Sequence, residues 1–244
     1  MLFKFEEEFY KQYGVSADFS GHPLLDIARP MMRKKDFFTR YNLSLTKTTI
    51  ALLPGSRNSE VKYILPVMLS ASSLIKKEIA DIQFIIAKST QVDWDIYKNL
   101  ICKFKTNCEV IEGLTYDCLE SSDFALVTSG TATLETAIIQ KPFLIIYRMN
   151  FLNYLLYRPL VKLSFIGIVN IISGRKIIPE FIQFNARPEK ISQEAIRILK
   201  NPSEIEHIKS ELAKVKASLG EKGASSRAAQ TVLSFLNNQG HPIC

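Results

Sequence analysis

The chain has 244 residues, of which 47% are hydrophobic and 23% are charged, and its net charge at pH 7 is +7. This length and apolar content suffice for one large α/β domain and exclude a low-complexity chain. The basic balance suits phosphorylated molecules, an anionic membrane surface or nucleic acid.

The cysteine and histidine content excludes a structural zinc site. The cysteines Cys102, Cys108, Cys118 and Cys244 form no C-x-x-C pair, and only three histidines are present. Because zinc needs four ligands at close spacings, we expect reduced thiols and no metal. We also expect no signal peptide and no membrane span, since three consecutive glutamates lie near the amino terminus and no apolar run reaches ~18 residues.

Residues 1–47 are predicted to need a partner surface because they have no core of their own. They begin with a helix that carries Phe5, Phe9 and Tyr13 on one stripe. A short strand and a turn are expected over residues 17–26. A mixed, charged linker is expected from there to residue 47.

From residue 48 the pattern alternates between strands and helices. Each expected strand is short, apolar and rich in β-branched or aromatic residues, as in strands covered on both faces. Such β-α-β alternation predicts a parallel sheet with right-handed crossovers. The expected strands are residues 49–53, 82–87, 109–111, 124–128 and 143–147.

Two further expectations concern the helices. Pro66 falls inside the first helical stretch, where an unaccommodated proline would cost about 3 kcal/mol, so we expect a kink or two short helices there. At the carboxyl end, apolar residues at spacings of three and four predict one helix from Ile205 to Leu219. A second helix is predicted from Ala228 to Leu236.

The loop after the first expected strand is a candidate phosphate site. Gly55 permits a close backbone approach, Ser56 offers a hydroxyl, and Arg57 can bind two phosphate oxygens at once. The first N–H groups of the following helix also favour an anion. Because the loop has neither the Walker nor the dinucleotide glycine pattern, a plain βα turn capped by Asn58 or Ser59 remains open.

A second candidate loop follows the fourth expected strand. Ser129, Gly130 and Thr131 bring hydroxyls and free amides to a strand end, and Glu135 is expected in the first turn of the next helix. Glu135 can accept both hydroxyls of a ribose, or it can cap the helix and complement its dipole. Two such loops at one sheet edge indicate a single ligand with a diphosphate and a ribose.

Residues 148–183 alternate aromatic and aliphatic residues with cations. This pattern is typical of a surface at a membrane interface, and the alternative is a core helix with snorkelling basic side chains. Nucleic acid is not an expected partner, because the basic residues are not clustered. The cations are Arg148, Arg158, Lys162, Arg175 and Lys176.

Taken together, these motifs resemble the lipid-A-disaccharide synthase family (glycosyltransferase family 19). The stretches "ALLPGSRNSEVKYILPV", "ALVTSGTATLETAIIQKPFLIIYR" and "VNIISGRKIIPEFIQ" resemble the carboxy-terminal half of that family. The opening "FEEEFYKQYGVSADFSGHPLLD" is similar to the end of its first domain. The resemblance covers nearly the whole chain in the same order.

The resemblance implies the two-domain glycosyltransferase-B (GT-B) fold. Its donor domain is a Rossmann-like parallel sheet with helices on both faces. By this resemblance, residues 1–47 are a remnant of the amino-terminal acceptor domain with the interdomain linker. Residues 48–204 form the UDP-sugar donor-binding domain, and residues 205–244 are helices that cross back to the first domain.

The implied reaction transfers 2,3-diacylglucosamine from UDP-2,3-diacylglucosamine to 2,3-diacylglucosamine 1-phosphate, a lipid X-type acceptor. It releases UDP with inversion at the anomeric carbon, without metal or cofactor. The acidic acceptor base is not among the matched residues, so the catalytic residue is unknown and weak UDP binding with poor turnover is expected. By resemblance the donor-binding residues are Gly55, Ser56, Arg57, Ser129, Gly130, Thr131, Glu135, Asn170, Arg175, Glu180 and Gln183.

The resemblance also implies a role in lipid A (lipopolysaccharide) biosynthesis, a cellular location and interaction partners. A cytoplasmic enzyme is implied, peripheral on the anionic inner face of the bacterial inner membrane. Apolar surface in residues 1–47 and 205–238 is expected to meet a separately encoded amino-terminal half or to cause self-association. Two alternatives remain open: another UDP-sugar enzyme of this fold, such as a UDP-N-acetylglucosamine 2-epimerase, and a non-catalytic UDP-binding half that needs a partner chain.

Overall fold

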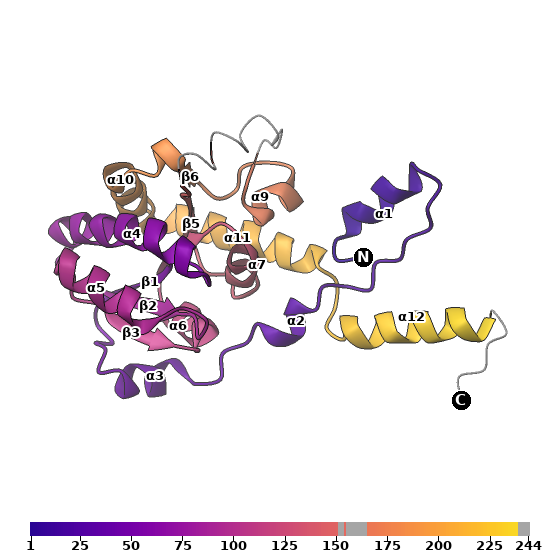
Figure 1. Cartoon of the computed structure of the whole chain (residues 1–244), viewed down its shortest axis with the longest axis horizontal. Coiled ribbons are helices and arrows are strands. Elements are labelled where there is room, and N and C mark those ends of the chain that lie inside the picture. Colours follow the sequence, from indigo (N-terminus) through magenta and orange to yellow (C-terminus); the bar gives the residue numbers. More distant parts are fainter. Residues whose placement is uncertain (151–153, 155–164, 239–244) are drawn as a thin grey trace.

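Parallel strands form one sheet in the computed structural model, which describes residues 1–150, 154 and 165–238 (Figure 1). The strands are β1 (Thr48–Leu53), β2 (Ile82–Lys88), β3 (Glu109–Glu112), β4 (Phe124–Thr128), β5 (Phe143–Tyr147) and β6 (Glu180–Ile182). Their order in this sheet is β3-β2-β1-β4-β5-β6, and every neighbouring pair is parallel. The expected parallel α/β architecture is therefore confirmed.

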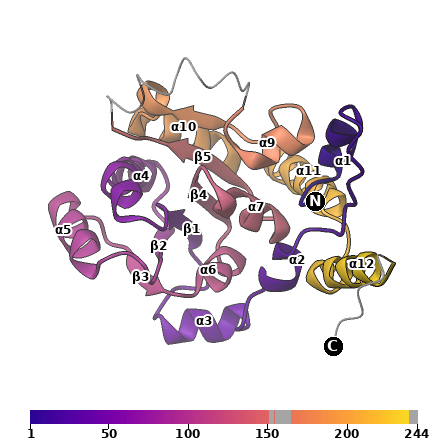
Figure 2. The ribbon, with the colours of Figure 1, turned by 45° about the vertical axis from the view of Figure 1, so that its right-hand side comes forward.

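Helices cover both faces of the sheet (Figure 2). One face carries α4 (Asn58–Glu78), α5 (Trp94–Phe104) and α10 (Pro188–Leu199). The other carries α6 (Thr115–Ser121), α7 (Thr131–Ile138), α9 (Ile168–Ser173) and α11 (Pro202–Ser218). The central strands are buried between these layers, which explains why their sequences are almost entirely apolar.

The first and fourth strands meet in the middle of the sheet. Leu52 of β1 lies opposite Leu126 of β4 on one side and opposite Ile86 of β2 on the other. The chain leaves β1 toward one face of the sheet and leaves β4 toward the other. The carboxyl ends of such divergent strands leave a crevice, which is where open α/β sheets bind ligands.

The strand predictions are confirmed, with one omission. All five expected strands are present, but β6 was not anticipated. It has only three residues, and it is defined by pairing with β5, where Ile145 lies opposite Glu180. A strand of that length has no periodicity of its own, so its partner alone determines it.

The helix α4 runs without a break through Pro66. It has 21 residues, so of the two alternatives expected at Pro66 the division into two short helices is wrong, and the kink stays a prediction. Val61, Ile64 and Met68 are fully buried beside the sheet. Packing of this apolar face outweighs the single backbone hydrogen bond that a proline removes.

The segment expected to be a linker contributes to the core. Residues 34–40 form the helix α3 (Lys34–Arg40), in which Phe37 and Phe38 are 0% and 2% exposed. Just before α3, the backbone N–H groups of Met31 and Met32 donate to the buried Asp117 of α6 at 2.8 and 2.7 Å. These contacts attach the segment to the domain.

The expected strand over residues 17–26 is also absent. That part of the chain is extended and then enters the short helix α2 (Leu24–Ile27). It lies beside no other strand of the described chain with which it could pair. At the edge of the sheet, a short 3-10 helix, η1 (Gln183–Asn185), follows β6.

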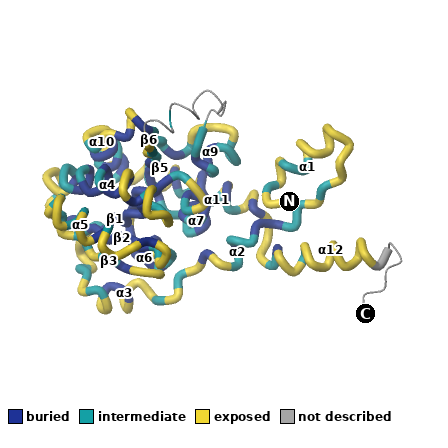
Figure 3. Tube along the Cα trace, viewed as in Figure 1, coloured by how far each residue is buried: buried dark blue, intermediate teal, exposed yellow. Residues whose placement is uncertain are grey.

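Two helices project from the body of the domain, and Figure 3 shows them as largely exposed. They are α1 (Lys4–Lys11) and α12 (Ala224–Asn238). Phe9 of α1 is 52% exposed and Phe235 of α12 is 64% exposed. Phe5 and Phe9 of the predicted stripe lie on α1 and are exposed, whereas Tyr13 lies beyond the end of the helix. The second predicted carboxy-terminal helix is present as α12. Within the described chain, no helix has the length and apolarity needed to cross a membrane.

Candidate functional site

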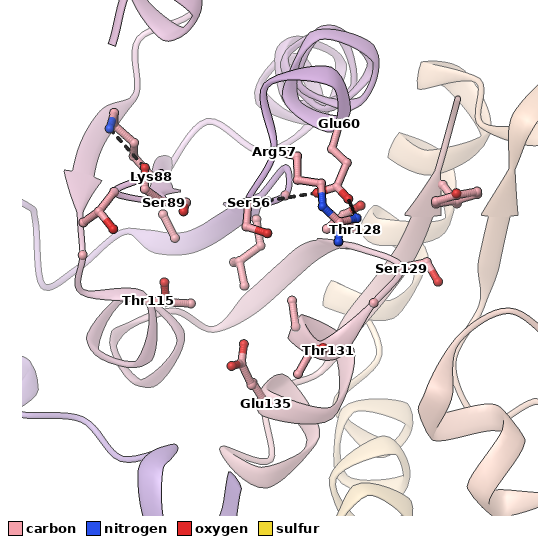
Figure 4. A pocket seen from close by; sticks show the side chains of 18 residues that line it. Ser56, Arg57, Glu60, Lys88, Ser89, Thr115, Thr128, Ser129, Thr131 and Glu135 are labelled. Atoms are coloured by element: carbon pink, nitrogen blue, oxygen red, sulfur yellow. Dashed lines mark hydrogen bonds and ion pairs between the residues drawn. The ribbon is translucent and has the colours of Figure 1, made fainter. Parts of the chain in front are cut away.

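The carboxyl ends of β1, β2, β4 and β5 surround a pocket of about 600 Å³ (Figure 4). Both loops singled out in the sequence contribute to its wall. The structure therefore brings together seven of the predicted donor-binding residues: Gly55, Ser56, Arg57, Ser129, Gly130, Thr131 and Glu135.

The first loop holds a carboxylate with the groups predicted to hold a phosphate. The backbone N–H of Ser56 donates to Glu60 Oε2 at 3.0 Å, and Arg57 Nη1 donates to Glu60 Oε1 at 3.1 Å. The backbone of Gly55 has φ +119°, and a Cβ there would lie 2.5 Å from Glu60 Oε2. The loop is thus shaped for a close oxyanion, which Glu60 in the first turn of α4 supplies in this structure.

The first residue of α4 does not cap the helix as expected. Arg57 is the N-cap and makes no side-chain capping bond, while Asn58 Nδ2 donates to Asp93 Oδ2 at 2.8 Å. Glu60 instead accepts the backbone N–H just before the helix. A glutamate three residues after the N-cap is a recognisable signal for this arrangement, but the sequence analysis did not use it.

The second loop presents the start of α7 to the pocket. Gly130 is the N-cap with φ +148°, and Thr131 follows with an exposed side chain. Ser129 faces elsewhere, because its hydroxyl donates to Ile166 O at 3.0 Å (Figure 4). Thr128, which was not predicted as a site residue, lines the pocket with a buried hydroxyl that has no hydrogen-bond partner among the described residues.

Glu135 points into the pocket between Thr115 and Thr131 (Figure 4). It is the fifth residue of α7, beyond the first turn, and its Oε1 accepts a hydrogen bond from Tyr116 Oη at 3.0 Å. That bond is not a cap of the helix start, so the capping interpretation of Glu135 is not supported. Burial raises the pKa of the Glu135 carboxyl, and the Tyr116 hydrogen bond partly opposes this. Burial and the nearby carboxylate also raise the pKa of Tyr116, so its hydroxyl keeps its proton.

The raised pKa of Glu135 predicts that Glu135→Gln stabilises the fold above the acidic range. In a folded state with a raised pKa, the charged form is disfavoured, so stability is lost as pH rises through the ordinary carboxyl range. Removing the charge should raise the free energy of unfolding at pH 8 by at most ~1 kcal/mol, as at other sites where function opposes stability. Urea unfolding at pH 8 and near pH 4 measures this; an equal gain at both values would contradict it.

The third predicted block lies outside this pocket and supports it. Asn170 is fully buried, donates to Ile178 O at 2.8 Å and to Glu180 Oε1 at 2.7 Å, and accepts two backbone N–H groups. Glu180 also accepts the N–H groups of Ile166 and Gly167 at 3.1 and 2.9 Å. Since Ile166 O receives the Ser129 hydroxyl, this network anchors the second loop.

The two remaining predicted residues also make structural contacts. Arg175 pairs with Glu211 of α11. Gln183 holds both backbone groups of Met149, at 3.1 and 3.0 Å, and has a positive φ of 46°. The cations Arg158 and Lys162 of the predicted membrane stretch lie outside the described residues.

Lys88 is a pocket residue that the sequence analysis missed. Its side chain is 1% exposed at the end of β2, where Nζ pairs with Glu112 and donates to Ser89 O at 3.1 Å. Its Nζ also lies 5.0 Å from the centroid of the Trp94 ring. The hydrogen bond from Lys88 lowers the pKa of Glu112. A lone lysine ending an apolar strand was the available signal.

Metal-ligating residues do not cluster in the described part of the chain. No group of three or more His, Cys, Asp or Glu there could hold a metal ion. Cys102, Cys108 and Cys118 are free thiols. Burial raises the pKa of Cys108 to about 11, which leaves it protonated and unreactive at neutral pH.

Comparison with solved structures supports the fold. The chain superposes on a Neisseria meningitidis UDP-GlcNAc 2-epimerase bound to UDP-GlcNAc with a TM-score of 0.62 and 14% identity, covering 95% of this chain and 59% of that one. It superposes on the S. aureus MnaA–UDP co-structure with a TM-score of 0.63 and 16% identity, covering 97% of this chain and 58% of that one. At these identities the likeness shows the fold alone, that of a GT-B domain.

Comparison with known sequences is more specific. The family described as LpxB, lipid-A-disaccharide synthetase, matches residues 1–235. The lipid-A-disaccharide synthase of Syntrophus aciditrophicus is 39% identical over 237 residues, which are 97% of this chain and 62% of the relative. That of Persephonella marina is 36% identical over 239 residues, 95% of this chain and 63% of the relative. The chain thus spans a little over three fifths of these relatives' length, and it belongs to the lipid-A-disaccharide synthase family.

Proposed function

We propose that this chain is the donor-binding portion of a lipid-A-disaccharide synthase. The full reaction would transfer 2,3-diacylglucosamine from UDP-2,3-diacylglucosamine to 2,3-diacylglucosamine 1-phosphate and release UDP. The family assignment supplies this chemistry, and the pocket supplies groups suited to UDP. The likeness to 2-epimerases concerns the fold alone and does not favour an epimerase.

The observation that carries the proposal is the carboxylate of Glu60 on the first loop. Its two oxygens accept hydrogen bonds from the Ser56 N–H and the Arg57 guanidinium. These are the groups that would donate to the oxygens of a diphosphate. The start of α7 opens into the same pocket, and Glu135 is suited to a ribose at its other side. We infer that the diphosphate lies between the two loops, where these groups stabilise the departing UDP.

Calorimetric titration of the chain with UDP tests the donor site. We expect saturable, enthalpy-driven binding of UDP and much weaker binding of uridine, because uridine lacks the diphosphate that Arg57 would hold. Equal affinity for UDP and uridine would mean that Arg57 and its neighbours do not bind the diphosphate. No detectable binding at millimolar UDP would rule out the donor site.

We propose that acceptor binding and the general base come from the part of the family's proteins that this chain does not cover. General-base assistance is typically worth ~10²–10⁴-fold, so the chain alone should turn over poorly. The outward-facing apolar residues of α1 and α12 offer a surface for such a partner, whether part of the same protein or a separate chain. Co-expression with the amino-terminal half of a relative should restore product formation. If the surface instead binds a second copy of this chain, light scattering should detect dimers.

We also propose peripheral binding to the anionic inner face of the bacterial inner membrane, on its cytoplasmic side. The basic net charge and the lipid substrates of the proposed reaction support this. Co-sedimentation with vesicles containing anionic phospholipid, and not with purely zwitterionic vesicles, is the expected result. Equal sedimentation with both, or none with either, would contradict it.

A further inference from the structure

A side-chain hydrogen bond joins α6 to Glu135 of α7. Tyr116 belongs to α6, which follows β3, and Glu135 belongs to α7, which follows β4. The hydroxyl of Tyr116 donates to Glu135 Oε1 at 3.0 Å. Glu135 lines the pocket, but Tyr116 is not among the described residues that line it. The hydrogen bond to Glu135 therefore links Tyr116 to the pocket.

This bond determines which part of the carboxylate faces the ligand. Tyr116 occupies one acceptor position on Oε1, and Oε2 has no hydrogen-bond partner among the described residues. A carboxylate accepts on both oxygens, so Oε2 and the second position on Oε1 stay open toward the space shown in Figure 4. A glutamate without such a restraint would sample several rotamers and hold this orientation only part of the time.

We propose that Tyr116 is a positioning residue that orients Glu135 to accept the vicinal hydroxyls of a ribose, and so makes the pocket selective for ribonucleotides over 2′-deoxyribonucleotides. This proposal rests on the proposed function, since it takes the ligand to be UDP. Selectivity follows because a 2′-deoxyribose leaves the half-buried carboxylate with an unsatisfied acceptor. Packing by the Tyr116 ring alone would stabilise α6 without changing which sugar is preferred.

The test compares the dissociation constants of UDP and 2′-deoxy-UDP in one set of calorimetric titrations. The wild-type chain should prefer UDP by ~10-fold or more, the ratio expected for a hydrogen bond to a charged group. Tyr116→Phe should reduce this preference to ~2- to 3-fold. The ring is retained, and the ratio is unaffected by any loss of folded protein, because such a loss changes both constants equally.

Two further variants separate positioning from packing. Tyr41→Phe removes the hydroxyl of a half-buried tyrosine at the end of α3, outside the pocket, and should leave the preference unchanged. In a Glu135→Ala background, which has no acceptor for the Tyr116 hydroxyl, Tyr116→Phe should have no further effect on the ratio.

Each outcome has a distinct meaning. An unchanged ratio in Tyr116→Phe together with a reduced ratio in Glu135→Ala would overturn the proposal while leaving the ribose contact in place. An unchanged ratio in Glu135→Ala would contradict the ribose contact, and with it the role of Tyr116. Failure of the wild-type chain to bind either nucleotide would refute the proposed function itself.

Discussion

Arg57→Ala should weaken UDP binding by about 10- to 30-fold, the effect of losing a charge-assisted hydrogen bond to phosphate at a solvent-accessible site. The Arg57 side chain is 78% exposed, and its guanidinium and the Ser56 N–H bind the same carboxylate, so a diphosphate can reach both groups. Arg57→Lys should recover only part of the affinity, because an ammonium cannot make two parallel bonds to one phosphate. Calorimetry with UDP measures both variants.

The chain offers a matched control for this substitution. Arg33 is also an exposed arginine, and it also pairs with an acidic residue three positions later, Asp36 at 2.8 Å. Arg33→Ala should leave the UDP affinity within twofold of the wild type. If Arg57→Ala and Arg33→Ala behave alike, Arg57 is not part of the donor site.

Phe37→Ala should lower the free energy of unfolding by about 3–5 kcal/mol, as expected for removing a fully buried phenylalanine. Phe37 is 0% exposed and its ring lies 4.9 Å from that of Tyr41, measured between centroids. Urea unfolding followed by circular dichroism gives the difference. A loss this large would show that residues 34–40 are an integral part of the domain.

The exposed Phe9 provides the comparison for Phe37. It is a phenylalanine on a helix outside the body of the domain, and at 52% exposure Phe9→Ala should change stability by no more than about 0.5 kcal/mol. Similar small losses for both variants would mean that α3 separates from the domain before the sheet unfolds.

The sheet and its two site loops were predictable because they depend on local patterns. Buried parallel strands are continuous apolar runs, and the glycines at 55 and 130 mark the turns that follow two of them. Residues from the first and fourth strands could be assigned to one pocket because all strands of a parallel sheet end at the same edge. The structure adds only that these two strands are direct neighbours.

The missed features depend on contacts between distant parts of the chain. Phe37 and Phe38 occur in a charged stretch, and only the contact of α3 with α6 makes them core residues. The role of Asn170 and Glu180 likewise depends on where Ile166 lies relative to Ser129. The resemblance implies that these two residues lie beside the donor; in the structure they lie outside the pocket and support its second loop.

The order of strands in the sheet also has a consequence for how the protein matures. Two walls of the pocket come from residues 53–60 and 128–135, which are far apart in the chain but follow strands that are adjacent in the sheet. During synthesis the first loop is therefore made well before its counterpart exists. A ligand that needs both loops would bind only after β4 has joined β1, and would then stabilise the completed sheet by mass action. Nucleotide binding would thus report on late folding of the chain.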